Sequence, residues 1–149
     1  MNYLFDTDAV SIFYDAARMP EHLRLKNRVS TLKDEDVLHV SVLTLFEFEY
    51  SYWNADTGQQ SRIRDTITQI SHTFGILPLQ HDSARIYGEI KSLFKQSTGR
   101  KPKEMKRYNI DLLIASTAIT ETGIVIGSDR LYRELAIVYP QFETENWFI

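Results

Sequence analysis

The sequence predicts an α/β fold with three layers, in which a central, mainly parallel sheet of about five strands lies between helices. Short apolar runs alternate with longer segments whose apolar residues recur every three or four positions, which is typical of strands followed by amphipathic helices. One run, residues 124–126, is wholly apolar, as expected for a buried strand of a parallel sheet. Because no repeat, low-complexity tract or long linker divides the 149 residues, we expect one domain spanning residues 1–149.

The expected strands are short and mostly apolar. They are placed at residues 3–5, 38–41, 76–79 and 124–126, with two late candidates at 137–138 and 147–149. Pro78 has no backbone N–H to donate, so the third segment is expected at an edge of the sheet. Gly127, Ser128 and Asp129 end the fourth strand.

Helices are expected between these strands, with limits set by proline, glycine and capping residues. They are placed at residues 9–17, 20–32, 43–53, 63–74, 83–98, 110–122 and 131–135. In the third helix, Leu43, Phe46, Tyr50 and Trp53 recur at spacings that form one helical stripe. The basic segment 100–107 is expected to be a loop or a helix extension.

The composition excludes several classes of protein. Cysteine is absent, which excludes disulfides and thiolate metal sites and fits a reducing compartment. No run approaches the roughly 20 apolar residues of a membrane span, and the first residues have no basic region of the kind that begins a signal peptide. We therefore expect a soluble, cytoplasmic protein with no membrane association.

Charge is unevenly distributed along the chain. The net charge is −3, yet between Arg85 and Arg107 eight basic side chains stand against two acidic ones. Such a stretch can offer phosphates a basic approach that is separate from an acidic pocket. The candidate RNA-binding residues in it are Arg100, Lys101, Lys103, Lys106 and Arg107. The same pattern fits a solvated helix face with a loop, so both interpretations stay open.

Four acidic residues are candidates for a metal site. Asp6 and Asp129 each follow an apolar strand, and ligand sites of parallel sheets form outside the carboxyl ends of strands. Asp111 and Glu47 lie near the starts of helices, which open on the same edge. Three or four carboxylates converging there would suit one or two Mg²⁺ or Mn²⁺ ions. Zinc is a poor match, because the four histidines show no HExxH spacing.

Each acid also has a structural interpretation. Asp111 could favour the positive end of its helix dipole, and Thr44 with Glu47 matches a capping box. Asp6 and Asp129 are not expected to cap helices, because each directly follows a strand, although aspartate is common in turns. Helical periodicity does not separate Glu47 from Glu49, since both flank the aromatic stripe. The choice between these two stays open on periodicity alone.

Four segments, taken in order, resemble the motifs of one family. They are Tyr3-Leu4-Phe5-Asp6-Thr7-Asp8, Ser41-Val42-Leu43-Thr44-Leu45-Phe46-Glu47-Phe48, Asp111-Leu112-Leu113-Ile114-Ala115 and Ser128-Asp129-Arg130, followed by Glu145-Asn146-Trp147 near the end. In this order they resemble the opening strand with the first acid, the second-acid helix, the third-acid helix start, the fourth-acid loop and the last strand of the PIN-domain ribonucleases. Within that family the chain is similar to the VapC-like toxins of bacterial toxin–antitoxin pairs.

The resemblance implies a metal-dependent endoribonuclease that cleaves RNA phosphodiester bonds with Mg²⁺ or Mn²⁺. By position, it makes Asp6, Glu47, Asp111 and Asp129 the catalytic, metal-binding acids, with Thr7 and Ser128 as hydroxyl neighbours that could position a water. It favours Glu47 over Glu49. The implied partners are RNA, a VapB-like antitoxin protein and a second copy of the chain in a homodimer.

The sequence departs from the family pattern at two places. Asp8 stands where such chains more often have asparagine, and could add a ligand or only a cap. Tyr108-Asn109-Ile110 replaces the glycine or proline often found before the third acid. These departures, together with the inserted residues 97–108, put in doubt any transfer of the family's RNA preference to this chain.

Two other functions compete with this one. Asp6 and Asp8 also satisfy the DxD motif of haloacid-dehalogenase-like phosphohydrolases, in which Asp6 would be the nucleophile. Against it, Ala9-Val10 follows where that family expects glycine and threonine, and Ser128-Asp129 stands without a second acid. A third possibility is a non-catalytic PIN-like module that only binds RNA or a partner. A lost acid would favour it, but all four are present.

Overall fold

The structure, a computed structural model, describes all 149 residues and contains one sheet of five strands. The strands are β1 (Asn2–Phe5), β2 (Val37–Ser41), β3 (Gly75–Leu77), β4 (Ile124–Ile126) and β5 (Glu143–Glu145). Their order is β3-β2-β1-β4-β5 and every neighbouring pair is parallel. The predicted parallel sheet is confirmed, with the central strand first in the sequence and β3 at an edge, as Pro78 led us to expect.

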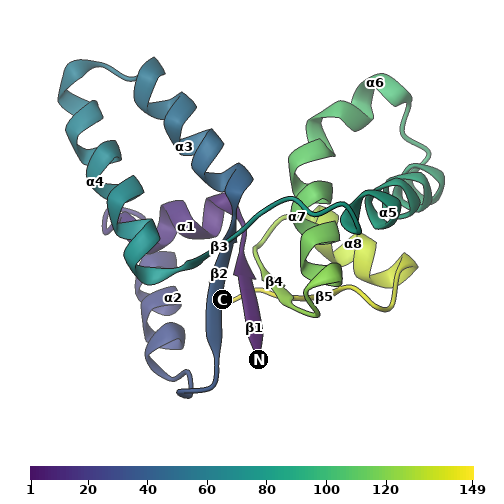
Figure 1. Cartoon of the computed structure of the whole chain (residues 1–149), viewed down its shortest axis with the longest axis horizontal. Coiled ribbons are helices and arrows are strands. Elements are labelled where there is room, and N and C mark those ends of the chain that lie inside the picture. Colours follow the sequence, from purple (N-terminus) through teal and green to yellow (C-terminus); the bar gives the residue numbers. More distant parts are fainter.

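The helices lie on both faces of the sheet. They are α1 (Thr7–Tyr14), α2 (Glu21–Ser30), α3 (Val42–Asn54), α4 (Thr57–Thr73), α5 (Ser83–Thr98), α6 (Pro102–Met105), α7 (Asn109–Thr120) and α8 (Arg130–Val138), with a 3₁₀ turn η1 (Lys106–Tyr108) before α7. Helices α1–α4 gather on one side of the sheet and α5–α8 on the other (Figure 1). The predicted three-layer α/β/α arrangement is therefore confirmed.

Alternation along the strands fills two separate cores. Phe5 and Ile126 point to one face, where they pack with residues of α1, α2 and α4. Leu4 and Val125 point to the other face and pack with residues of α5, α7 and α8. Because successive side chains of a strand face opposite ways, the wholly apolar β4 is explained by burial on both faces.

The late strands were predicted at the wrong residues. Residues 137–138 are the end of α8, and Ile137 is 80% exposed. Residues 147–149 form no strand, although Trp147 and Phe148 are buried in the core beside β1. The actual last strand, β5, is the polar stretch Glu143–Glu145 at the sheet edge. An edge strand needs no apolar alternation, so it carried no hydrophobic signal.

Two other segments differ from expectation, one in its limits and one in its structure. The helix expected at 9–17 is α1, which ends at Tyr14. The basic segment 100–107 is neither a plain loop nor an extension of α5, because α5 ends at Gly99 in a left-handed conformation (φ 66°), and the segment then forms α6 and η1. No helix in the structure has the length and apolarity that crossing a membrane requires.

Candidate active site

The carboxyl ends of β1, β2 and β4 meet at one edge of the sheet. In the register of these strands Phe5 lies beside Val40 and Ile126, so the residues that follow are neighbours. A pocket of about 430 Å³ opens there. It is lined by Asp6, Thr7, Asp8, Ser11, Glu47, Arg107, Ile110, Asp111, Ser128 and Asp129. The structure thus brings together all four acids and both hydroxyl residues that the sequence singled out.

Asp6 ends the central strand and begins the first helix. Its side chain is only 4% exposed, and its Oδ1 accepts a hydrogen bond from the backbone N–H of Ala9 at 2.8 Å. Its other oxygen lies against Gly127, where an added Cβ would come within 2.6 Å of Oδ2. Residue 127 must therefore be glycine for Asp6 to keep this position.

The expectation that the strand-ending acids do not cap helices is wrong. Asp6 is the N-cap of α1, and Asp129 is the N-cap of α8, accepting from the backbone N–H of Leu131 at 2.9 Å. The connections from strand to helix are short: Asp6 alone separates β1 from α1, and residues 127–129 separate β4 from α8. An ionised carboxylate has about four acceptor positions, so a cap leaves oxygen free to bind a cation.

Glu47 has no capping role. The N-cap of α3 is Ser41, whose hydroxyl accepts from the backbone N–H of Leu43. Thr44 instead bonds its hydroxyl to that of Thr7 at 3.0 Å. Thr7 donates to Glu47 Oε1 at 2.5 Å, so Thr44 must be the donor to Thr7. The hydrogen of Thr7 is committed to orienting Glu47, and Thr7 can meet a water only as an acceptor.

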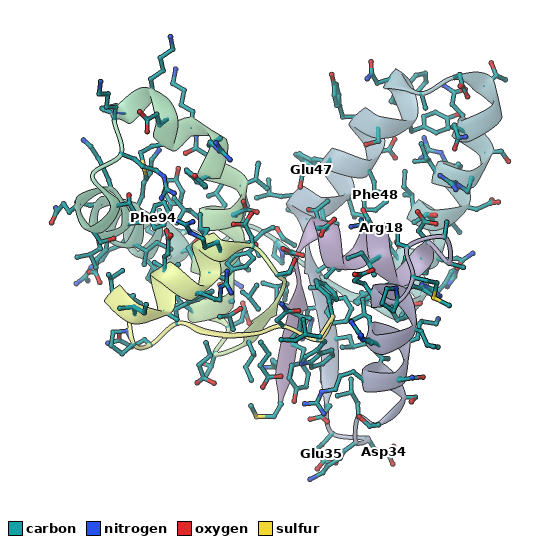
Figure 2. The ribbon with its side chains drawn as sticks, turned by 180° about the vertical axis from the view of Figure 1, so that it is seen from behind. Arg18, Asp34, Glu35, Glu47, Phe48 and Phe94 are labelled. Carbon is teal, nitrogen blue, oxygen red and sulfur yellow. The ribbon has the colours of Figure 1, made fainter.

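Glu49 belongs to a different environment. Arg64 of α4 donates to both of its carboxylate oxygens, at 2.6 and 3.0 Å. Glu47 instead lines the acidic pocket, and Figure 2 shows it on the lower part of α3, toward the middle of the molecule. The geometry separates two acids that periodicity could not.

Asp111 is held by a residue that the sequence analysis missed. It lies in the first turn of α7, and the hydroxyl of Tyr132 donates to its Oδ1 at 3.3 Å. Tyr132 is 1% exposed, and burial together with the neighbouring acids raises the pKa of its phenol well above the usual value. A signal existed, because Tyr132 follows Asp129 by three residues and so shares its helix face.

The acids raise one another's pKa. Burial, then the charges of Asp8 and Asp111, raise the pKa of Asp6 to about 7, against the lowering effect of the Ala9 hydrogen bond. The pKa of Asp111 is raised to about 6, first by burial and then by Asp129 and Glu47. A cation bound in the pocket would relieve this repulsion.

None of the four acids takes part in an ion pair anywhere in the structure. Acids near them but outside the set are paired with arginine: Asp8 with Arg18 at 2.9 Å, Glu49 with Arg64 at 2.6 Å and Glu134 with Arg130 at 2.7 Å. The negative charge of the pocket is therefore uncompensated by the protein, apart from Arg107 on its lining.

The donor set suits a hard divalent cation. Carboxylate and hydroxyl oxygens line the pocket and no histidine does, which fits Mg²⁺ or Mn²⁺ rather than zinc. All four carboxylates line the pocket, although no group of three is arranged to hold an ion in these side-chain positions. Each of the four accepts a hydrogen bond from a donor of the protein. Mg²⁺ usually binds through one or two carboxylates and several waters, so the pocket still fits it.

Asp8 lines the pocket, but its carboxylate is already bound by another residue. Its Oδ1 is bound by Arg18, and its side chain is about half exposed. A phosphohydrolase of the DxD type needs this second aspartate for proton transfer beside Asp6. Turned toward Arg18, Asp8 does not favour that alternative.

The basic residues of segment 100–107 have different surroundings. Only Arg107 lines the acidic pocket. Arg100 packs over the rings of Phe94 and Tyr108, at 5.0 and 4.7 Å, and pairs with Glu134 at 3.4 Å, so it is a structural residue. The remaining three, Lys101, Lys103 and Lys106, are exposed on α6 and η1.

A second cavity of about 660 Å³ adjoins the first and shares Thr7 and Glu47 with it. Helices α1, α3 and α4 supply most of its walls. Leu43, Phe46 and Tyr50 of the predicted α3 stripe line this cavity, and Trp53 follows beside it, one turn further along α3. Only Leu43 is buried, while Phe46, Tyr50 and Trp53 are 66%, 68% and 75% exposed. A row of exposed aromatic side chains marks an interaction surface.

The burial of Asp6 makes stability depend on pH. Its folded pKa of about 7 exceeds the ordinary value of 3.8 for an aspartate, so the folded state binds this proton more tightly. The stability from the protonated form is complete below pH 4 and is lost as pH rises through 7, on the order of 4 kcal/mol at about 1.4 kcal/mol per unit. Asp6→Asn keeps a capping oxygen and removes the charge. With EDTA present, we expect the variant to exceed the wild type in free energy of unfolding at pH 8, and the gap to close toward pH 4.

The control is Asp56→Asn, because Asp56 is an exposed N-cap that accepts from Gln59 at 2.9 Å. The free energy of unfolding of all three proteins is measured by urea denaturation at pH 4, 6 and 8. An Asp6→Asn variant that is less stable than the wild type at pH 8 would contradict the burial cost.

Solved structures share the fold of the whole chain. A chain of VapBC2 from Rickettsia felis, bound to a DNA fragment from the promoter, has a TM-score of 0.77 and 20% identity, with 99% of both chains covered. A chain of VapBC-1 from nontypeable Haemophilus influenzae has a TM-score of 0.78 and 19% identity, covering 99% of this chain and 98% of that one. For VapBC-5 from Mycobacterium tuberculosis, described as a member of the VapBC family of toxin-antitoxin systems, the values are 0.67 and 18%, covering 97% and 98%.

Sequence comparison identifies the family. No curated protein sequence matches this chain. The family model for the PIN domain, however, matches residues 3–138, nearly the whole length. The resemblance seen in the four sequence segments is thereby confirmed, and the phosphohydrolase alternative is not favoured. The chain belongs to the PIN-domain family, whose members are generally nucleases.

Proposed function

We propose that the protein is a metal-dependent endoribonuclease and the toxin of a type II toxin–antitoxin pair. The observation that carries the proposal is the pocket at the carboxyl edge of the sheet, where Asp6, Glu47, Asp111 and Asp129 stand together without ion-pair partners. Membership of the PIN-domain family supports nuclease chemistry. The likeness to VapBC structures supports the toxin assignment.

Each residue has a distinct task in this proposal. One or two divalent cations, when bound, would activate a water for attack on phosphorus and stabilise the charge that develops. Asp6, Glu47, Asp111 and Asp129 hold the cations directly or through water, and no protein nucleophile is needed. Thr7 keeps Glu47 directed into the pocket through its hydrogen bond.

Two further lining residues, Arg107 and Ser128, are proposed to contact the substrate or the attacking water. Arg107 is the only lysine or arginine on the pocket lining, and a guanidinium suits a phosphate oxygen through paired N–H donors. Ser128 is exposed on the loop after β4, so its hydroxyl is free to position a water, as the family resemblance implies. Thr7, by contrast, uses its hydrogen on Glu47.

Two acids on one helix provide a matched test of cleavage. Glu47 and Glu49 are two residues apart on α3, but only Glu47 lines the pocket. We expect Glu47→Gln to lower the rate of RNA cleavage by about 100-fold or more, in the range that lost transition-state stabilisation produces. Glu49→Gln breaks only a partly exposed ion pair, worth about 1 kcal/mol or less, and is expected to cleave at nearly the wild-type rate.

The measurement is cleavage of RNA with mapped ends, in Mn²⁺ or Mg²⁺ and in EDTA, with Asp6→Asn and Asp129→Asn alongside. Equal loss in Glu47→Gln and Glu49→Gln, or cleavage that persists in both aspartate variants, would refute this site. A trapped phosphoryl group on Asp6 would instead indicate a phosphohydrolase.

The exposed lysines of α6 and η1 are proposed as RNA contacts beside Arg107. Reversing Lys101, Lys103 or Lys106 to glutamate is expected to weaken RNA binding and to lower the slope of log affinity against log salt by roughly 0.7 for each lost contact with single-stranded RNA. Lys33→Glu, at an exposed position after α2, is the control. An unchanged slope in all three variants would leave these lysines as a solvated surface only.

An antitoxin of the VapB type is proposed to cover the second cavity. This cavity shares Glu47 and Thr7 with the acidic pocket, so a protein bound there would also block access to the acids. The exposed aromatic side chains of α3 offer it apolar contact area. The homodimer implied by the family resemblance and the cytoplasmic location expected from the composition stay predictions.

Trp53 is the strongest test of this surface, because buried tryptophans often dominate the energy of protein interfaces. We expect Trp53→Ala to weaken binding of the protein encoded immediately upstream by about 30-fold or more, which corresponds to roughly 2 kcal/mol. RNA cleavage by the free variant is expected to stay near wild type. Ile137→Ala is the control, since Ile137 is an equally exposed apolar residue on the distant α8. Binding measured by titration calorimetry that is equal in both variants would contradict the proposed surface.

A further inference from the structure

We propose that Tyr132 is a positioning residue of the metal site, whose hydroxyl holds Asp111 while its ring edge lies beside Asp6. This inference rests on the proposed function, because it assigns a role within the same pocket. Tyr132 does not line that pocket itself. It acts from the buried side, chiefly through the Asp111 carboxylate.

The contacts of the hydroxyl carry the inference. It donates its one hydrogen to Asp111 Oδ1 at 3.3 Å. The ring edge reaches the same place, since a Cβ added at Gly127 would lie 2.8 Å from Tyr132 Cε2 and 2.6 Å from Asp6 Oδ2. Asp6 follows β1 and Asp111 opens α7, so Tyr132 links acids from two separate elements.

Packing of the ring does not explain the hydroxyl. The ring lies in the core formed by α5, α7 and α8, 6.0 Å from the ring of Phe142. A phenylalanine would fill the same apolar space. A buried hydroxyl without a partner is costly, and the partner that this one finds is the Asp111 carboxylate. The hydroxyl is therefore placed for the site and not for the core.

The chemistry of the donor matters as well. A lysine or arginine at this position would hold the same carboxylate but would cancel the charge that attracts a cation. A phenol donates a hydrogen bond without adding charge. It can therefore fix the position of Asp111 and leave the negative charge of the pocket available to the metal.

The test compares Tyr132→Phe with Tyr3→Phe in the full-length protein. Tyr3 is also a buried tyrosine of the sheet region, but its ring packs on Trp147, away from the pocket. We expect Tyr132→Phe to bind Mn²⁺ about 10- to 100-fold more weakly, the usual effect of losing a hydrogen bond to a metal ligand. Tyr3→Phe is expected to bind as the wild type does. Direct Mn²⁺ titration and the rise of Tm with Mn²⁺ concentration measure this without reference to activity.

A second readout separates positioning from loss of structure. Unfolding in EDTA shows whether Tyr132→Phe is folded, and the Mn²⁺ concentration for half-maximal RNA cleavage is expected to rise with the dissociation constant. If the wild type binds Mn²⁺ and a folded Tyr132→Phe binds it within twofold as tightly, this inference is wrong while the proposed function stands. If the wild type itself binds no Mn²⁺, both are wrong.

Discussion

A carboxylate buried at the end of the central strand is the constraint on which the site depends. Asp6 is buried because β1, the strand that it follows, lies between β2 and β4 and is covered by helices on both faces. Burial raises its pKa to about 7. Neighbouring groups fix both oxygens of this carboxylate: the backbone N–H of Ala9 donates to one, and the backbone of Gly127 lies close to the other.

Much of this arrangement could be predicted from the chain because it is local. Asp6, Asp111 and Asp129 follow strands or open helices, and a parallel sheet brings those ends to one edge. The alternation of short apolar runs with helical periodicity likewise predicted the sheet and the layers. The pattern could not show which hydrogen-bond partner each side chain has. That Asp129 caps α8 and that Thr7 serves Glu47 depend on short connections and on contacts between elements.

Long-range packing explains the remaining errors. The sequence places Tyr132 three residues after Asp129, but only the approach of α8 to α7 places its hydroxyl on Asp111. Arg100 reads as one of a basic run, yet it packs on Phe94 and Tyr108. The aromatic stripe of α3 has the spacing of a core face but lies exposed, since periodicity reports which residues share a face and not what covers that face. The same holds for the polar β5, which pairs at an edge without an apolar pattern.

The partners of the acids distinguish function from structure in this chain. Asp8, Glu49 and Glu134 are held by arginine, and such pairs neutralise charge. The four acids of the pocket are held by neutral donors: backbone N–H groups for Asp6 and Asp129, a threonine hydroxyl for Glu47 and a phenol for Asp111. Neutral donors fix geometry without cancelling charge, so the pocket keeps a field that attracts a cation. If these acids served only to cap helices, some of them could equally be paired with lysine or arginine, and none is. The type of donor that holds each acid therefore supports a metal-binding role more strongly than the number of acids does.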